Sequence, residues 1–236
     1  MRRLRRILAI LAGFVLAIGV TLYGWLGLTS ASAADLPPLK DGDIIFQYSG
    51  SSQSLPILLA SRSVYTHMGI IDLTEKSGPM VLEAASPVKA TPLDEWIESG
   101  DGGRITIKRD PTLTHDQANA ILNEARKYLG LPYDLFFLNG RDAIYCSELV
   151  HLAYGDGAGI YVGQIQKVKE LDIDYAPVRK LIEQRWQRYP LCRDGQKQSF
   201  DDCYRTILEQ ELVTPASIAR DARLQMVFTN FGIAAE

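Results

Sequence analysis

The chain has 236 residues, of which 47% are hydrophobic and 22% charged, a composition that excludes collagen-like, repeat-array and extensively disordered proteins. Its net charge is −3, but residues 1–34 hold four arginines and no acid, so the remainder carries 21 basic against 28 acidic residues. An acidic body repels phosphate backbones, and we therefore expect no nucleic-acid partner.

The first 34 residues have the order of an export signal: a positive end, an apolar middle and small residues at a cleavage site. Four arginines precede the apolar run Ile7–Leu28, and Ala31-Ser32-Ala33 fits the A-x-A cleavage pattern. The run is longer than that of a usual signal and reaches the roughly 20 residues that span a bilayer. Residues 1–34 are therefore either a cleaved signal peptide or a retained membrane anchor. In both cases we expect an exported body, periplasmic or held at the outer side of the cytoplasmic membrane.

A proline-bearing linker at residues 35–40 leads into the body of the protein, and we expect a single domain from residue 41 to residue 236. Ile44–Phe46 predicts a short strand after a glycine turn. The spacing of the apolar residues in 51–62 predicts a helix.

Two further strands, at Val64–Leu73 and Met80–Ala85, are expected to form a hairpin around a turn at residues 74–79. If this turn centres on residue 75, residues whose numbers sum to about 150 face each other. His67 would then lie opposite Glu83 on one face of the hairpin.

The residues that follow predict a strand and a capped helix. Arg104–Arg109 alternates apolar and polar residues, as a strand does. Thr114 and Gln117 form a capping-box pair, so a helix should begin there. Leu129 would be the last residue of its apolar stripe, and Gly130 would stop the helix.

Cys146 is expected to open another helix, which Gly155 would end. From about residue 164 the domain has a C-terminal extension with helical patterns at Val178–Arg188 and Ser199–Leu212.

The three cysteines all lie in the exported part. Cys192 and Cys203 are separated by ten residues in a polar, loop-like stretch. An oxidising compartment would let these two pair in a disulfide, although two unrelated free thiols fit the sequence as well. If the two pair, Cys146 is an odd thiol that calls for an explanation.

Cys146 has the position of a nucleophile. At a helix start, free backbone N–H groups and the helix dipole favour the thiolate, which is the form that attacks carbonyls. The competing interpretation is a buried structural cysteine.

A nucleophile needs a base, and the chain has three histidines. His151 would point away from Cys146 around the same helix, and His115 lies in a polar first turn. His67, on an apolar strand, remains as the best base, although it could simply be a satisfied histidine in a sheet. Glu83 is a lone acid in an apolar run, either paired with His67 as its orienting group or on a solvent face.

Several motifs resemble NlpC-like papain-fold peptidases. Gly130-Leu-Pro-Tyr133 with Tyr145-Cys-Ser-Glu-Leu-Val150 resembles their "PY … DCSGLV" block, and His67-Met-Gly-Ile70 resembles their "HVGI" strand. The histidine motif precedes the cysteine motif here, which is the order of the circularly permuted, YiiX-like group. The stretches "GDIIFQ" and "YCSELV" look like signatures of that group. The resemblance covers roughly residues 41–163.

The resemblance implies an α+β, papain-like fold in which a small antiparallel sheet packs against helices and the catalytic cysteine begins a helix. It implies that Cys146 attacks, that His67 takes and returns the proton, and that Glu83 orients His67. The backbone N–H of Cys146 would bind the oxyanion. Tyr133 matches a family tyrosine near that oxyanion, although packing at a turn is an equal alternative.

These observations predict an exported cysteine hydrolase that cleaves an amide or ester through a thioester on Cys146. Cell-wall peptides (peptidoglycan fragments) and acyl lipids are the two substrate classes considered. The alternative from another functional class is a non-catalytic envelope protein that binds a ligand with the same fold. No H-x-x-x-H, C-x-x-C or P-loop motif occurs, so we expect no metal and no cofactor. Membrane contact would come from the N-terminal segment if that segment is not cleaved.

Overall fold

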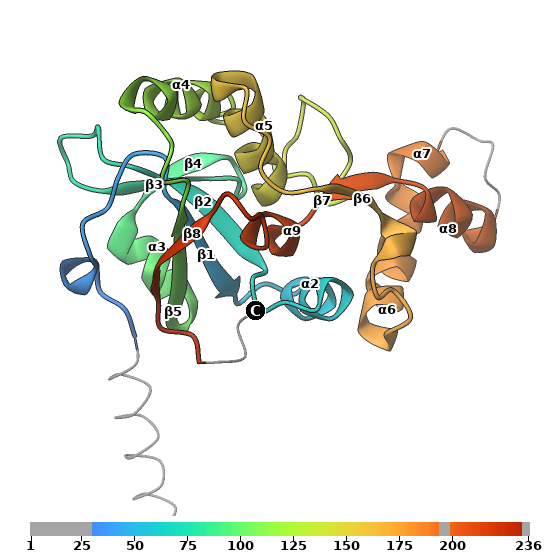
Figure 1. The fold of residues 1–236 in the computed structure, drawn as a ribbon. Helices are drawn as coiled ribbons and strands as arrows, with labels where there is room; N and C mark the ends of the chain where they lie inside the picture. The colour runs from blue at the N-terminus through green and yellow to red at the C-terminus, as the bar shows by residue number, and fades with distance from the viewer. Residues whose placement is uncertain (1–29, 194–198, 233–236) are drawn as a thin grey trace, which may run out of the picture.

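The computed structural model describes residues 30–193 and 199–232 (Figure 1). Most of the predicted leader, residues 1–29, lies outside the described residues. Within the described ranges no helix has the length and apolar character that a bilayer crossing requires.

The centre of the fold is a six-stranded antiparallel sheet with strand order β4-β3-β2-β1-β5-β8. The final strand of the chain pairs with β5 and forms one edge of the sheet. The expected small antiparallel sheet is thus present. Its strands are β1 (Ile44–Ser49), β2 (His67–Asp72), β3 (Met80–Glu83), β4 (Lys89–Pro92), β5 (Gly100–Arg109) and β8 (Gln225–Thr229).

Helices cover both faces of this sheet. The helices α4 (His115–Arg126) and α5 (Cys146–Ala158) lie side by side on one face, and α3 (Leu93–Ser99) lies on the other (Figure 1). Because strand side chains alternate, Ile44 packs toward α4 and α5, whereas Ile45 packs toward α3. The fold is therefore α+β with a core on each side of the sheet.

The β2–β3 hairpin has a different register from the predicted one. Ile70 pairs with Leu82 and Asp72 with Met80, so facing residue numbers sum to 152 rather than 150. His67 and Glu83 are consequently diagonal rather than directly opposite. Since the side-chain period of a strand is two, a two-residue shift keeps both residues on the same face.

The helix beginning predicted at Thr114 is confirmed, because its side chain and that of Gln117 form a complete capping box. The predicted end is wrong: α4 stops at Arg126, and Leu129 is exposed rather than part of the apolar stripe. Gly130, at a φ of 86°, belongs to the turn that follows.

Cys146 opens α5 as predicted, but the helix does not end at Gly155. It continues to Ala158, and Gly159 adopts the left-handed C-terminal conformation. Gly155 lies against the ring of Tyr161, where a Cβ atom would overlap the ring. The glycine is therefore explained by close packing and not by a helix end.

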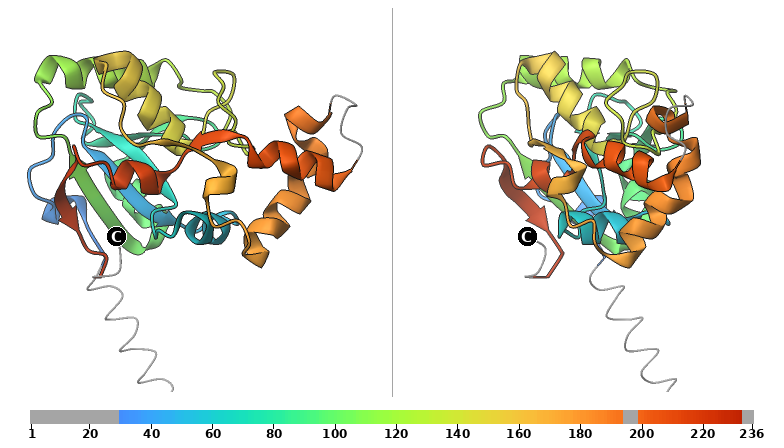
Figure 2. Two further views of the ribbon diagram at one scale, coloured as in Figure 1. Left: turned by 45° about the vertical axis from the view of Figure 1, so that its right-hand side comes forward. Right: turned by 90° about the vertical axis from the view of Figure 1, so that its right-hand side faces the viewer.

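The C-terminal extension is mainly helical. Figures 1 and 2 show α6, α7 and α8 at the end of the molecule away from α3 and β8. The predicted helix at residues 199–212 is shorter than expected, because its last residues form a strand, β7. The extension contains β6 (Ile165–Lys167), the 3-10 helix η2 (Val168–Glu170), α6 (Ala176–Arg185), the 3-10 helix η3 (Trp186–Arg188), α7 (Pro190–Arg193), α8 (Phe200–Leu208), β7 (Glu211–Val213) and α9 (Pro215–Ala219).

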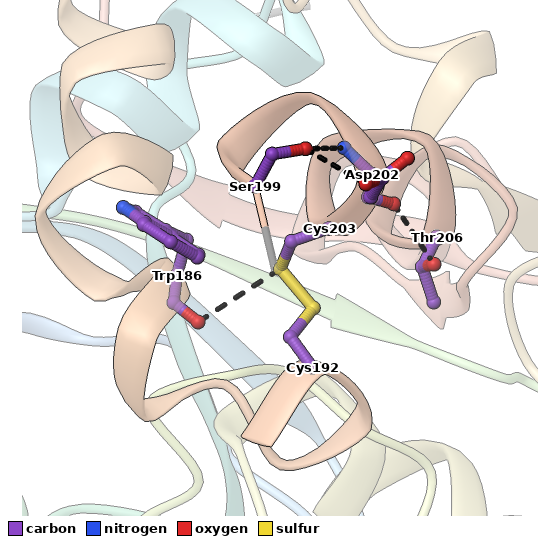
Figure 3. The surroundings of a disulfide bond; sticks show 6 residues. All are labelled: Trp186, Cys192, Ser199, Asp202, Cys203 and Thr206. Carbon is purple, nitrogen blue, oxygen red and sulfur yellow. Dashed lines mark hydrogen bonds between the residues drawn. A yellow bond between two sulfur atoms is a disulfide. The ribbon is translucent and has the colours of Figure 1, made fainter. Parts of the chain in front are cut away.

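Cys192 and Cys203 form a disulfide between α7 and α8, with their Cα atoms 5.4 Å apart (Figure 3). The stretch expected to be loop-like therefore carries both cysteines on helices. Ser199 begins α8 by accepting a hydrogen bond from the backbone N–H of Asp202 at 3.2 Å.

The small residues of the predicted cleavage motif lie against the body of the protein. The backbone N–H of Ala31 donates to the Gly103 carbonyl at 2.9 Å, and that of Ala33 donates to Asp94 Oδ1 at 2.9 Å. The short 3-10 helix η1 (Ala33–Asp35) follows.

Candidate active site

Cys146 is the first residue of α5 and is 3% exposed. Tyr145, at the cap position, is extended with φ −107° and ψ 166° and supplies no side-chain cap. The first backbone N–H groups of the helix are thus available to an anion, and the helix dipole favours negative charge at this point. An oxyanion or a thiolate would be stabilised here.

His67 is the first residue of β2, at the end of the strand that approaches α5. Its Nε2 lies 2.5 Å from Glu83 Oε2, and its ring also interacts with Cys146. Because Nε2 is occupied by the carboxylate, Nδ1 is the nitrogen left for the sulfur. The Trp96 ring is stacked on the imidazole at 5.8 Å between centroids. The imidazole is therefore held from three directions.

Glu83, a lone acid in an apolar strand, is buried and fully partnered. Its Oε1 accepts from the Thr91 hydroxyl at 2.5 Å, and its Oε2 accepts from the Trp96 indole N–H at 3.1 Å. Lys89 Nζ lies 3.8 Å from Oε1. These contacts offset the cost of burying the carboxylate and fix its direction toward His67.

A glycine lets the diagonal pair meet. Extending the hairpin register by one residue places Gly69 opposite Glu83, two residues along β2 from His67. A Cβ atom on Gly69 would lie 2.5 Å from Val81 Cγ1, 2.7 Å from the Leu82 carbonyl oxygen and 3.4 Å from Glu83 Cβ. The missing side chain therefore leaves the Glu83 carboxylate free to cross toward the imidazole.

The pair is electrostatically coupled. Burial alone would lower the pKa of His67, but the hydrogen bonds and charges of Cys146 and Glu83 outweigh burial and raise this pKa to about 10. Burial opposes ionisation of Glu83, yet His67, Thr91 and Lys89 hold the pKa of its carboxyl below the usual value. At neutral pH the arrangement favours an imidazolium next to a carboxylate.

Tyr133 is the fourth residue at this point. Its hydroxyl accepts a hydrogen bond from Gln53 Nε2 at 3.3 Å and interacts with the neighbouring Cys146. Burial and the neighbouring sulfur raise the pKa of Tyr133 well above its ordinary value, so the phenol stays protonated as a donor. Tyr133 lines the same cavity as Cys146, and its role in binding the oxyanion stays a prediction.

Sequence reasoning missed Gln53 and Arg185. Gln53 precedes α2 (Ser54–Ser61), and its side-chain Oε1 accepts from Arg185 Nη2 at 3.0 Å. Arg185 also donates from Nη1 to the Leu135 carbonyl at 2.5 Å. A chain of hydrogen bonds therefore runs from the C-terminal extension through Gln53 to Tyr133, beside Cys146.

A cavity of about 140 Å³ opens beside Cys146 and Tyr133. Its walls come from α2, from the loop at residues 133–137 and from the C-terminal extension, and they are overwhelmingly apolar. The extension supplies much of the lining: Val168, Leu171, Ile173, Val178, Leu181, Ile182, Tyr189, Ile207, Leu212 and Val213.

The other two histidines lie elsewhere. His151 Nδ1 is 2.8 Å from the Val162 carbonyl, and His115 is exposed near Asn119. Glu148, in the first turn of α5, is 4% exposed, and its Oε1 accepts from the Gly140 N–H at 3.1 Å. Burial raises the pKa of Glu148 to about 8.

Comparison with known proteins shows which family this chain resembles. Residues 38–228 match the family described as permuted papain-like amidase enzyme, YaeF/YiiX, C92 family. The uncharacterized protein YiiX of Escherichia coli K12 is 41% identical over 148 residues, which cover 62% of this chain and 73% of that protein. The crystal structure of metalloprotein YiiX from Escherichia coli O157:H7 is similar with a TM-score of 0.70 and 35% identity. That similarity covers 80% of this chain and 97% of the other.

Proposed function

The chain belongs to the YaeF/YiiX (C92) family of permuted papain-like amidases, and we propose that it cleaves an amide through a thioester on Cys146. One arrangement carries this proposal: His67 and Tyr133 both interact with the sulfur of Cys146, which lies at a helix start without a side-chain cap. A nucleophile, a proton carrier and an oxyanion donor are the parts that acyl transfer needs.

In the proposed reaction the sulfur of Cys146 attacks the amide carbonyl carbon. The oxyanion that forms is stabilised by the Cys146 backbone N–H and the Tyr133 hydroxyl. His67 gives its proton to the nitrogen as the carbon–nitrogen bond breaks, which releases an amine and leaves a thioester. Water then attacks the thioester while His67 takes a proton from the water. The carbon–sulfur bond breaks, which releases the carboxylic acid and restores the free Cys146.

Glu83 acts on His67 in this scheme, not on the substrate. Its carboxylate fixes the ring orientation and stabilises the imidazolium that protonates the leaving amine. Its own partners, Thr91 and Trp96, hold it in place through both oxygens.

A similar solved structure is described as a metalloprotein. In the described ranges of this chain, no three His, Cys, Asp or Glu side chains gather into a cluster that could hold a metal ion. The proposed steps use only the side chains and backbone of this chain.

Alkylation of Cys146 tests the proposal directly. A thiol activated by His67 should react with iodoacetamide rapidly at pH 6, where an ordinary thiol with a pKa of about 8.5 is almost entirely protonated. His67→Ala should lower that rate by at least about tenfold, whereas His115→Ala should not. Equal rates in wild type and His67→Ala would refute the proposed activation and favour the non-catalytic binding alternative. Cys146→Ala serves as the labelling blank.

The cavity favours one of the two substrate classes. A cell-wall peptide is polar, whereas the space beside Cys146 is lined almost wholly by apolar side chains. An amide with an aliphatic acyl chain is therefore the second, more specific candidate. Hydrolysis of peptidoglycan fragments and of acyl amides by wild type, with Cys146→Ala as the blank, decides between them. Turnover of the polar peptides alone would reject the acyl candidate.

We also propose that the domain works outside the cytoplasm. The arginine-rich apolar leader and the Cys192–Cys203 disulfide support this location. Fractionation of cells that express the full chain, with mass determination of its N-terminus, tests export and distinguishes a cleaved signal from a retained anchor.

A further inference from the structure

Arg185 is the single charged side chain among the residues that line the cavity. It projects from α6 in the C-terminal extension and is partly buried. Placing a guanidinium in an apolar wall costs free energy unless a partner compensates its charge. The partners of Arg185 therefore indicate whether the fold alone accounts for it.

Its hydrogen-bond partners are both neutral. The guanidinium donates to Gln53 Oε1 and to the Leu135 carbonyl, which uses two of its five N–H groups. The residues described here offer it no carboxylate at ion-pair distance. Asp134 is the carboxylate whose charge affects the pKa of Arg185. Its two oxygens accept hydrogen bonds from the backbone N–H groups of Phe136 and Leu138.

The pKa of Arg185 agrees with this geometry. Burial and the positive charge of Arg188 lower it, whereas Tyr133 and Asp134 act in the opposite direction. The group nevertheless stays protonated, because an arginine side chain does not lose its proton in a protein. A permanent positive charge without an ion-pair partner among the described residues therefore lies in the wall of an otherwise apolar space.

This charge shares a cavity with the nucleophile, because Arg185, Tyr133 and Cys146 all line it. Arg185 donates to Gln53, Gln53 donates to Tyr133, and Tyr133 interacts with Cys146. A ligand that fills the cavity with its carbonyl at Cys146 would therefore also lie against Arg185.

We propose that the cavity binds an anionic amphiphile, an acyl amide whose aliphatic chain lies among the apolar walls and whose carboxylate or phosphate pairs with Arg185. A guanidinium pairs with either anion through two parallel hydrogen bonds. The ligand supplies the countercharge that the protein lacks, and the apolar walls strengthen the pairing by excluding water. Only the amide bond of this ligand rests on the proposed function. Binding of the aliphatic chain and of the anion does not require that the protein hydrolyse the ligand.

Binding to the inactive variant Cys146→Ala tests the proposal without hydrolysis. The probes are N-octanoylglycine, its uncharged partner N-octanoylglycinamide, and octyl phosphate, each measured by titration calorimetry. We expect N-octanoylglycine to bind at least about tenfold more tightly than the glycinamide, the usual strength of a charge-assisted pair. Comparison with octyl phosphate shows whether carboxylate or phosphate is the preferred anion.

Substitution of Arg185 assigns the preference to this residue. In the Cys146→Ala background, Arg185→Met should remove the difference in affinity between N-octanoylglycine and N-octanoylglycinamide. Arg185→Lys in the same background should retain part of this difference. Arg179→Met, on the exposed side of the same helix, is the matched control and should leave the difference intact. Thermal melts of each variant verify folding.

Three results would overturn the proposal: equal binding of both glycine compounds, a preference that survives Arg185→Met, or no binding of any probe. A purely structural role for Arg185, holding Gln53 and Tyr133, predicts a different outcome. Arg185→Met in the active enzyme would then lower kcat equally for the charged and the neutral substrate. Absence of hydrolysis by wild type would reject the proposed function yet leave the binding result standing.

Discussion

The carboxylate of Glu83 is bound at both oxygens and lies beside His67, so its charge acts on the imidazole at short range. This charge and the sulfur of Cys146 raise the pKa of His67 to about 10. The pair should therefore stay ionised across neutral and mildly alkaline pH. A neutral amide at position 83 would keep the shape but not the charge.

Glu83→Gln should lower the pKa of His67, because the stabilising anion is removed. The alkaline limb of the kcat/KM profile should move to lower pH, and the maximum should fall by about 10- to 100-fold. Profiles with an acyl-amide substrate from pH 5 to pH 10 measure both effects. Glu95→Gln, at an exposed site on α3, is the control. An unchanged alkaline limb would show that Glu83 does not set the protonation of His67.

Glu148 is a buried acid that the proposed chemistry does not use. No described residue gives its buried Oε2 a hydrogen bond of the usual length and angle, and burial raises the pKa of Glu148 to about 8. In the unfolded chain the group ionises near 4.5. Between these values the folded state binds more protons than the unfolded state, so stability falls as pH rises from about 4.5 to about 8.

Glu148→Gln should remove this loss of stability. The melting temperatures of variant and wild type should agree near pH 5, and the variant should be more stable by about 3 °C or more at pH 8.5. Thermal melts at several pH values measure the difference, and Glu98→Gln, an exposed acid, provides the control. A constant difference between variant and wild type across this range would contradict the raised pKa.

At the scale of elements, the contact between His67 and Glu83 depends on how β2 and β3 pair. Gly69→Ala should disturb this pairing, because the new Cβ atom would meet Val81 and the Leu82 carbonyl at less than van der Waals distance. We expect a loss of about 1–3 kcal/mol in the free energy of unfolding and a slower alkylation of Cys146. Denaturant melts and the iodoacetamide rate measure these effects.

Gly50→Ala is the matched control for this substitution, since nothing lies within 4 Å of the position its Cβ atom would take. If Gly69→Ala kept the stability and the alkylation rate of wild type, the hairpin would tolerate a side chain at this position. The contact between Glu83 and His67 would then not depend on a glycine at residue 69.

The pairing also shows what the sequence could predict. The hairpin followed from two strand-like runs and the turn between them, which need only local information. The shared face of His67 and Glu83 followed from an assumed turn centre at residue 75, and it held because the two-residue error in the register leaves the face pattern unchanged. The exact register was not predictable, because it depends on where the 74–79 turn centres. The start of α5 at Cys146 was predictable, whereas its end was masked by Gly155, a glycine retained for packing.

Gln53 and Arg185 had no comparable signal. They are 132 residues apart, and each is an ordinary polar residue next to or within a short helix. Only the folded extension brings Arg185 to the end of α2. The cavity could not be predicted from the sequence either. Its apolar lining comes from segments whose patterns predict helices but do not indicate which surface these helices cover.

At the scale of the whole molecule, the C-terminal extension forms a wall of the cavity and also contributes the edge strand β8 to the sheet. Its helices α7 and α8 are joined by the Cys192–Cys203 disulfide (Figure 3). In the chain-entropy model, closing a loop of this sequence separation, 11 residues, stabilises the folded state by about 3 kcal/mol. The six-stranded sheet and α5 lie outside the closed loop.

Removing the disulfide should therefore affect the wall more than the catalytic residues. In Cys192→Ser with Cys203→Ser, we expect limited proteolysis to cut first between α6 and α8, while the alkylation rate of Cys146 stays near that of wild type. The KM for an N-octanoyl amide should rise several-fold, because its chain contacts the loosened wall. The KM for the matching N-acetyl amide should change little, because an acetyl group does not reach it. Equal changes for both substrates, or loss of Cys146 alkylation, would mean that the extension supports the catalytic centre itself and not the acyl chain alone.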